Sequence, residues 1–102
     1  MTTITLINTL VVKPGRIDEF IALQKDFANA MSGRQAGLLG GRMHRTLDGS
    51  KAVLISQFAS REAQAATTQS AEFRAHLAKL REMVDSSSPD FYEVAYTYGA
   101  FK

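Results

Sequence analysis

The first run of apolar and β-branched residues, from Ile4 to Val12, has the pattern of a β-strand. Because successive side chains of a strand point to opposite faces, Asn8 shares its face with apolar residues, and the other face is also largely apolar. A strand that is apolar on both faces is central in its sheet or lies between two layers. Pro14 and Gly15 directly after this strand predict a turn.

The next segment, from Ile17 to about Ser32, repeats its apolar residues at helical spacing. The apolar stripe of this helix comprises Ile17, Phe20, Ile21, Phe27, Ala28 and Met31. Glycines lead from the helix into a second strand, predicted from about Leu39 to Leu47. Asp48–Gly49 is a strong hairpin signal, so a third strand is predicted from Lys51 to Ala59.

Two serines mark the starts of two further helical segments. Ser60 is a candidate N-cap for a short helix that continues to about Thr68. Ser70 is a candidate N-cap for the following helix, predicted from Ala71 to Val84. The face of that helix expected to pack on the sheet comprises Phe73, His76, Leu77, Leu80, Met83 and Val84.

The serines and the proline at 86–89 predict the end of this helix. A final strand is predicted from Phe91 to Tyr98, with Tyr92, Val94, Tyr96 and Tyr98 on one face. The order β-α-β-β-α-β, with the second helix broken in two, is typical of a ferredoxin-like α+β fold: an antiparallel four-stranded sheet with helices on one face. The uncovered apolar face of the sheet predicts a homodimer, in which two sheets pack face to face into a shared barrel.

Length and composition narrow the class of protein. With 102 residues, one domain over 1–102 is the default, and 45 % hydrophobic with 22 % charged residues is ordinary for a soluble globular chain. No apolar run is long enough to cross a bilayer, and the scattered net charge of +2 does not resemble a nucleic-acid tail, so neither a membrane nor a nucleic acid is an expected partner. The sequence has no cysteine, which excludes disulfides, iron–sulfur clusters and thiolate zinc sites. No signal-peptide pattern is seen, so a cytoplasmic location is expected.

Short motifs spread over nearly the whole chain resemble the antibiotic biosynthesis monooxygenase family of the dimeric α+β barrel superfamily. These motifs are Val12–Gly15 followed by Phe20, Gly37–Gly40, Phe58–Ala63, Ser70–Phe73 with His76, and Phe91–Val94. The resemblance implies a homodimeric barrel with an apolar pocket between sheet and helices in each subunit. It also implies oxidation of a phenol, anthrone or quinol by molecular oxygen as co-substrate, with no metal, flavin or haem. Some relatives degrade haem, and others act without oxygen, so the fold alone does not settle the reaction.

Asn8 and His76 are the candidate catalytic residues. An amide buried without partners costs about 1–3 kcal/mol, so Asn8 is expected either to bond to its neighbours or to donate to a substrate oxygen. The resemblance places an asparagine in this strand. His76 is either a core histidine or a general base, because an ordinary pKa near 6.5 suits proton abstraction at neutral pH. In haem-degrading relatives a histidine of this helix ligates iron, but the three-residue spacing from Phe73 differs from theirs and disfavours that role.

The expected substrate-binding residues are Phe58, Phe73, His44, Arg42, Ser56 and Tyr96. Phe58 stands where relatives often have tryptophan and is expected to pack in the core or to form a wall of an aromatic pocket. Arg42 and His44 share one face of the second strand; they are surface residues if that face is open, or a cation and a base if it faces the pocket. Tyr96 belongs to a tyrosine stripe that is interface or core, or that donates to a quinol.

The favoured hypothesis is a cofactor-independent monooxygenase acting on a small aromatic substrate. Haem binding or degradation on the same fold is one alternative, with His44 and His76 as the possible axial ligands. A non-catalytic dimeric barrel that binds a small apolar ligand is another. An RNA-recognition module is disfavoured, because the third strand lacks the aromatic residues on which bases stack.

Overall fold

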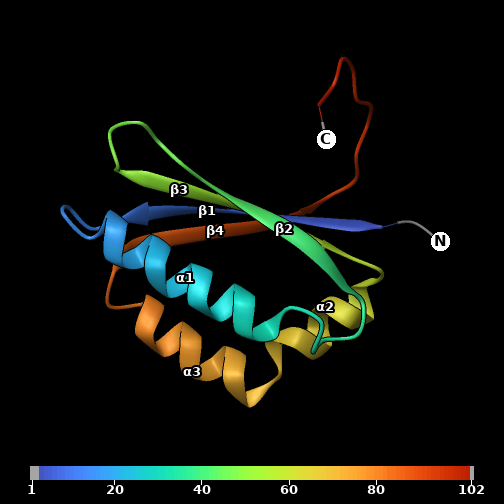
Figure 1. Ribbon diagram of the computed structural model, residues 1–102, viewed down its shortest axis with the longest axis horizontal. Coiled ribbons are helices and arrows are strands. Elements are labelled where there is room, and N and C mark those ends of the chain that lie inside the picture. Colours follow the sequence, from blue (N-terminus) through green and yellow to red (C-terminus); the bar gives the residue numbers. More distant parts are fainter. Residues whose placement is uncertain (1–2, 102) are drawn as a thin grey trace.

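The computed structural model describes residues 3–101. Its elements are β1 (Ile4–Val12), α1 (Ile17–Met31), β2 (Leu38–Arg45), β3 (Lys51–Phe58), α2 (Arg61–Thr68), α3 (Ala71–Leu80) and β4 (Val84–Tyr92). The strands form one antiparallel sheet in the order β2-β3-β1-β4, and the helices lie on one face of it (Figure 1). The ferredoxin-like α+β fold predicted from the sequence is therefore confirmed.

The core lies between the middle of the sheet and the two longer helices. Its buried members are Leu10, Val12, Phe20, Ala52, Leu80 and Met83. Phe20 of α1 has no exposed surface, and Leu10 of β1 is 2 % exposed. Since side chains alternate along a strand, Leu10 and Val12 identify the helix-facing side of β1, and Asn8 lies on that side with them. We call the opposite surface of the sheet the open face.

The two predicted serine caps are confirmed. The Ser60 hydroxyl accepts a hydrogen bond from the backbone N–H of Ala63 at 3.1 Å, and the Ser70 hydroxyl accepts one from Phe73 N–H at 3.1 Å. Each bond satisfies a donor that would otherwise be unpaired in the first turn of α2 or α3. The Ser70 cap fixes the start of α3 and therefore which of its residues face α1 and the sheet.

The end of α3 and the position of β4 differ from the prediction. The helix stops at Leu80, and the residues 86–89 that were expected to end it lie inside β4. β4 pairs only with β1, so it is an edge strand, where a proline is tolerated because one side needs no partner. Pro89 lies opposite Asn8 in this ladder. The sequence pattern predicted a loop at these serines, because an exposed edge strand does not need apolar residues at alternate positions.

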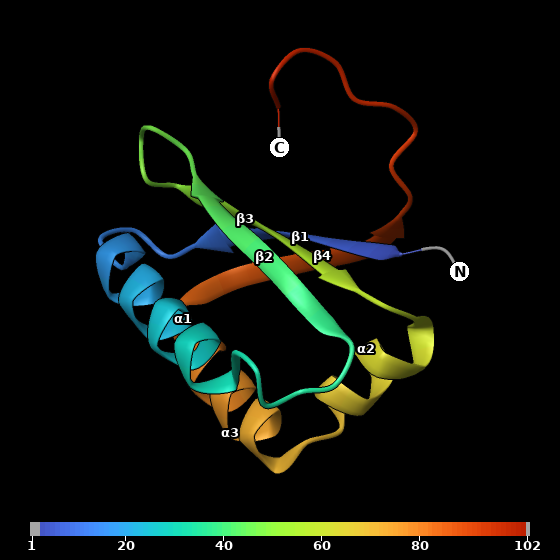
Figure 2. The same cartoon turned by 45° about the vertical axis from the view of Figure 1, so that its right-hand side comes forward.

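The predicted final strand also ends too late. Tyr92 is paired with Thr5, and β1 begins at Ile4, so β1 extends beside no more than one residue beyond Tyr92. Residues 93–101 have no regular secondary structure and extend over the side of the sheet opposite the helices (Figure 2). Tyr96 and Tyr98, predicted on a strand, lie in this segment with 78 % and 81 % of their surface exposed.

Gly37, between α1 and β2, is expected to resist substitution. Its φ is +86°, and an added Cβ would lie 2.5 Å from the Cβ of Ala63 in α2. Gly33 is a matched control, with φ +77° and nothing within 4 Å of an added Cβ. Gly33→Ala is expected to lower the free energy of unfolding by about 1 kcal/mol through backbone strain alone. Gly37→Ala is expected to lower it by about 2–4 kcal/mol, because overpacking adds to that strain. Urea denaturation measures both; equal losses would mean that α2 shifts freely away from the new methyl group.

Candidate functional site

Asn8 presents an unpaired acceptor to the helices. It lies in the middle of β1, between Leu54 of β3 and Pro89 of β4. Its Oδ1 atom is buried, and no residue of the described chain forms a hydrogen bond with it. A buried polar atom without a partner costs free energy, and such atoms occur at sites where a ligand completes the bonding. An amide can present Oδ1 as acceptor or, after a half-turn of its plane, Nδ2 as donor.

His76 is held in place by two residues of α1. The imidazole is 6 % exposed, and its Nε2 is hydrogen-bonded to Oε1 of Gln24. Its ring stacks on the ring of Phe27, with centroids 3.9 Å apart and planes 5° from parallel. Phe27 in turn meets Phe73 edge to face at 6.2 Å. The histidine ring is therefore fixed in both plane and direction.

The electrostatic surroundings keep His76 neutral near pH 7. Burial lowers its pKa below the ordinary value of 6.5, and the positive charge of Lys79 lowers the pKa further. Both effects disfavour the imidazolium form. A neutral imidazole retains a lone pair on one ring nitrogen, so this group can accept a proton without first losing one.

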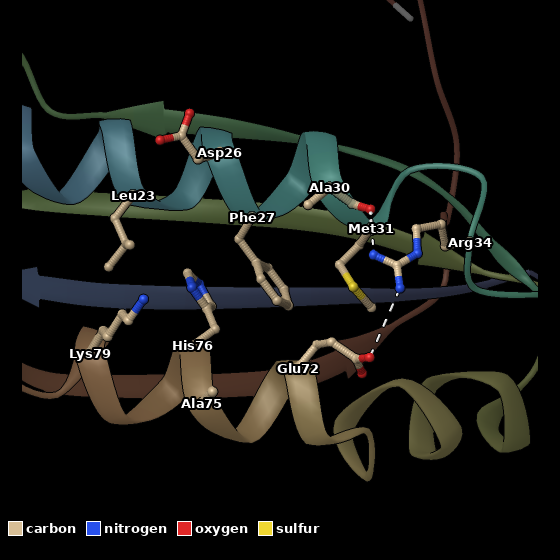
Figure 3. Close-up of a pocket in the computed structure, with 10 residues that line it drawn as sticks. All are labelled: Leu23, Asp26, Phe27, Ala30, Met31, Arg34, Glu72, Ala75, His76 and Lys79. Atoms are coloured by element: carbon tan, nitrogen blue, oxygen red, sulfur yellow. Dashed lines mark hydrogen bonds and ion pairs between the residues drawn. The ribbon is translucent and has the colours of Figure 1, made fainter.

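A groove of about 340 Å³ opens between α1 and α3, and His76 and Phe27 lie in it. Figure 3 shows both rings between the two helices, with β1 passing behind the gap. Charged residues line the groove: Asp26 and Arg34 from α1 or just beyond it, and Glu72 and Lys79 from α3. Arg34 and Glu72 form an ion pair across the groove at 3.9 Å. The groove thus combines an aromatic interior with a charged rim.

Five of the predicted site residues come from the sheet surface that faces the helices or from α3 itself. They are Asn8, Ser56, Phe58, Phe73 and His76. Ser56 is directly opposite Leu6 of β1, and Phe58 is opposite Ile4, so both share the helix-facing side with Asn8. Phe58 is 4 % exposed and packs as a core residue.

Three predicted site residues lie elsewhere. Arg42 and His44 are exposed and pair with Ile55 and Val53, on the open face. The Arg42 guanidinium is 5.7 Å from the ring centre of Phe101, beside a second cavity of about 450 Å³ on that face. Tyr96 lies in the segment after β4. Of the eight predicted site residues, all within the described chain, His76 alone lines the groove between α1 and α3.

The face of β2 was not predictable because the strand is irregular. Leu38 pairs with Phe58, but Gly40 pairs with Gln57, so Leu39 is an extra residue in the ladder. One extra residue exchanges the two faces for everything after it. Met43 consequently packs against the core, and its neighbours in sequence point to the open face.

Gln24 is the site residue that the sequence analysis missed. It follows Phe20 by four positions and precedes Phe27 by three, which places it on the buried stripe of α1. Ala28, which was assigned to that stripe, is exposed, whereas Gln24 is half-buried. A glutamine on an apolar stripe is the same kind of signal as Asn8 on its strand face, and it could have been identified in the same way.

Two further structural findings concern other kinds of site. Within residues 3–101, no three His, Asp or Glu side chains are grouped so that they could hold a metal ion. None of the helices in the described part of the chain has the length and apolar character needed to span a membrane.

Comparison with known proteins identifies the family. A family model described as antibiotic biosynthesis monooxygenase matches residues 3–79, whereas no curated protein matches the chain by sequence. Among solved structures, SnoaB, a cofactor-independent oxygenase from Streptomyces nogalater, is 21 % identical over 95 % of this chain and 97 % of that chain, with a TM-score of 0.83. A conserved protein from Methanosarcina mazei Go1 is 18 % identical over 91 % of this chain and 93 % of that chain, with a TM-score of 0.82. The family model covers most of the chain, and the chain therefore belongs to the antibiotic biosynthesis monooxygenase family.

Proposed function

We propose that this protein is a monooxygenase that oxidises an aromatic phenol, anthrone or quinol with molecular oxygen, without metal, flavin or haem. The observation that carries the proposal is the buried histidine of lowered pKa in the groove, His76. An unpartnered buried amide oxygen on the helix-facing side of β1, at Asn8, is the second group that the proposal uses. Membership of the family supports monooxygenase chemistry. The fold shared with SnoaB, described as a cofactor-independent oxygenase, supports the absence of a cofactor.

In the proposed reaction the substrate hydroxyl, or the enol form of an anthrone, donates a hydrogen bond to Asn8 Oδ1. When the amide of Asn8 turns so that Nδ2 donates to the substrate oxygen, the hydroxyl proton is released from Oδ1, and His76 takes it. The resulting anion is rich in electrons and reduces oxygen directly. For an anthrone the methylene carbon becomes a carbonyl; one oxygen atom enters the product, and the other leaves as water with the two methylene hydrogens.

The surroundings of His76 do not fit haem iron. Its Nε2 is already bonded to Gln24, and one face of the ring is covered by Phe27. Ligation through Nε2 would have to break the first contact and displace the second. His44, the other histidine of the chain, is exposed on the open face. These contacts favour proton transfer over iron ligation as the role of His76.

The proposed enzyme is a homodimer formed through the open face. That face carries Ile7, Val53 and Ile55 of the central strands, which no helix of the same chain covers. Large side chains at the end of β4 and in the segment that follows it are also exposed: Tyr92 in β4, then Val94, Tyr96, Tyr98 and Phe101. A second copy of the chain is the favoured partner for this face, because most oligomers of soluble proteins are symmetric dimers in which the same apolar surface of each copy is buried.

Oxygen uptake by the purified protein tests the function. With anthrone or a hydroquinone and excess chelator, uptake is expected to exceed autoxidation and to consume one O₂ per substrate. His76→Ala is expected to reduce the rate by about 10²–10⁴-fold, because the general base is lost. His44→Ala removes the other histidine, on the opposite face of the sheet; with the oligomeric state checked by sedimentation to match wild type, this control is expected to keep the rate.

The pH profile of the same reaction gives an independent readout. Because the pKa of His76 is lowered and the neutral form is the base, the rate is expected to rise with pH through a midpoint below 6.5 and to be level above about pH 7. A chelator-sensitive rate, or equal loss in the two histidine variants, would contradict the proposal.

A further inference from the structure

Gln24 of α1 and His76 of α3 are joined by a side-chain hydrogen bond. In the structure Nε2 of the imidazole is hydrogen-bonded to the carbonyl oxygen Oε1 of Gln24. With the amide in this orientation the oxygen accepts the hydrogen bond, and Nε2 is the donor. In a neutral imidazole the other nitrogen, Nδ1, then has the lone pair.

We propose that Gln24 is a positioning residue, which holds His76 as the Nε2–H tautomer and leaves Nδ1 as the atom that accepts the substrate proton. The stacked ring of Phe27 prevents the imidazole from tilting, and the hydrogen bond from His76 to Gln24 prevents it from turning over. Both contacts come from α1, whereas the histidine is on α3. The catalytic part of this inference rests on the proposed function; the tautomer does not.

The position of Gln24 is otherwise hard to explain as packing. Gln24 is half-buried and lies on the buried stripe of α1, where the other positions are mainly apolar. That stripe includes Phe20 and Met31, which are 0 % and 2 % exposed. An apolar residue of similar size would fill the same space without the cost of burying an amide. The gain from the amide is a fixed acceptor for the histidine N–H.

Charged groups in the groove set the sign of the expected pH effects. Lys79 of α3 lowers the pKa of His76. Asp26 and Glu72 are acidic groups in the same groove, and Glu72 is paired with Arg34. A carboxylate placed at position 24 would stand directly at Nε2 and act more strongly than these groups, because an adjacent opposite charge favours the imidazolium.

Two substitutions separate positioning from packing. Gln24→Glu keeps the size of the side chain and is expected to raise the pKa of His76 by about 1 unit or more. The midpoint of the rate profile is expected to move up equally. Gln24→Leu removes the acceptor and is expected to leave His76 as a mixture of tautomers. Gln69→Glu introduces the same charge at an exposed position between α2 and α3 that lines neither cavity, and it is expected to change neither quantity.

The test is ¹⁵N NMR of the full chain with labelled histidine, together with oxygen-uptake profiles. The expected wild-type spectrum has a protonated Nε2 and an unprotonated Nδ1 on His76. A protonated Nδ1, or a His76 titration that Gln24→Glu does not move, overturns the inference. If the spectrum is as expected but no substrate is oxidised, the tautomer assignment holds and the proposed function fails.

Discussion

Asn8→Leu is expected to make the protein more stable and, at the same time, inactive. The substitution removes a buried acceptor that has no hydrogen-bond partner in the described chain and replaces it with apolar surface facing the helices. Eliminating such an unsatisfied group is expected to raise the free energy of unfolding by about 1–3 kcal/mol. Loss of the group that would bind the developing oxyanion is expected to lower the oxidation rate by about 10²–10³-fold.

The substitution is informative because stability is expected to rise while the oxidation rate falls, whereas most inactivating substitutions in a small protein also lower its stability. Urea denaturation and oxygen uptake on the same preparation measure both quantities. Asn8→Ala is a second variant that removes the amide without adding volume. Asn29→Leu is the control, because Asn29 is an exposed asparagine of α1 outside the groove, and both quantities are expected to stay near wild type.

Either of two results would contradict this picture. A stabilised Asn8→Leu protein with full activity would remove Asn8 from the chemistry. A destabilised one would show that the amide already has bonding partners in the ligand-free protein, which was the other expectation drawn from the sequence.

Phe20→Ala is expected to cause the largest loss of stability. Phe20 is the largest fully buried side chain, and it packs in the cluster that joins α1 to β1, β3 and α3. Truncation to alanine is expected to lower the free energy of unfolding by about 3–5 kcal/mol, which includes the cost of the cavity left behind. For a chain of 102 residues this is a large share of the total stability.

Thermal unfolding followed by circular dichroism measures this loss. Leu47→Ala is the control, because Leu47 is fully exposed in the β2–β3 hairpin and its truncation is expected to change stability by less than about 0.5 kcal/mol. A Phe20→Ala protein that unfolds within 1–2 °C of wild type would mean that the helices repack over the vacated space.

The parts of the fold predicted correctly from sequence are those with strong local signals. Ser60 and Ser70 each act as caps, and Asp48–Gly49 lies in the turn of the β2–β3 hairpin. β4 was misplaced because its position depends on what lies beside it. An edge strand of serines forms because β1 offers a partner, and the tyrosine-rich segment after Tyr92 remains irregular because β1 has ended.

The same distinction applies to the site. Asn8 and His76 stood out as polar residues in apolar patterns, and the structure places both on buried surfaces. The contact between His76 and Gln24 joins residues 52 positions apart, and its pairing is decided by how α1 and α3 pack together. The side of the sheet taken by Arg42 depended on a one-residue irregularity that leaves no trace in the alternation of the strand.

The extra residue in β2 suggests how a sheet of this kind can change the side chains that face its helices. If Leu39 entered the ladder opposite Gln57, the pairing of β2 would shift by one residue and every later side chain would turn to the other side, so that Arg42 and His44 would face the helices in place of Met43. A one-residue shift of register would therefore bring two basic groups to the helix-facing side in place of an apolar one, which no single substitution achieves. In descendants of such a scaffold, affinity for acidic compounds can therefore arise through a shift in strand pairing as well as through replacement of side chains.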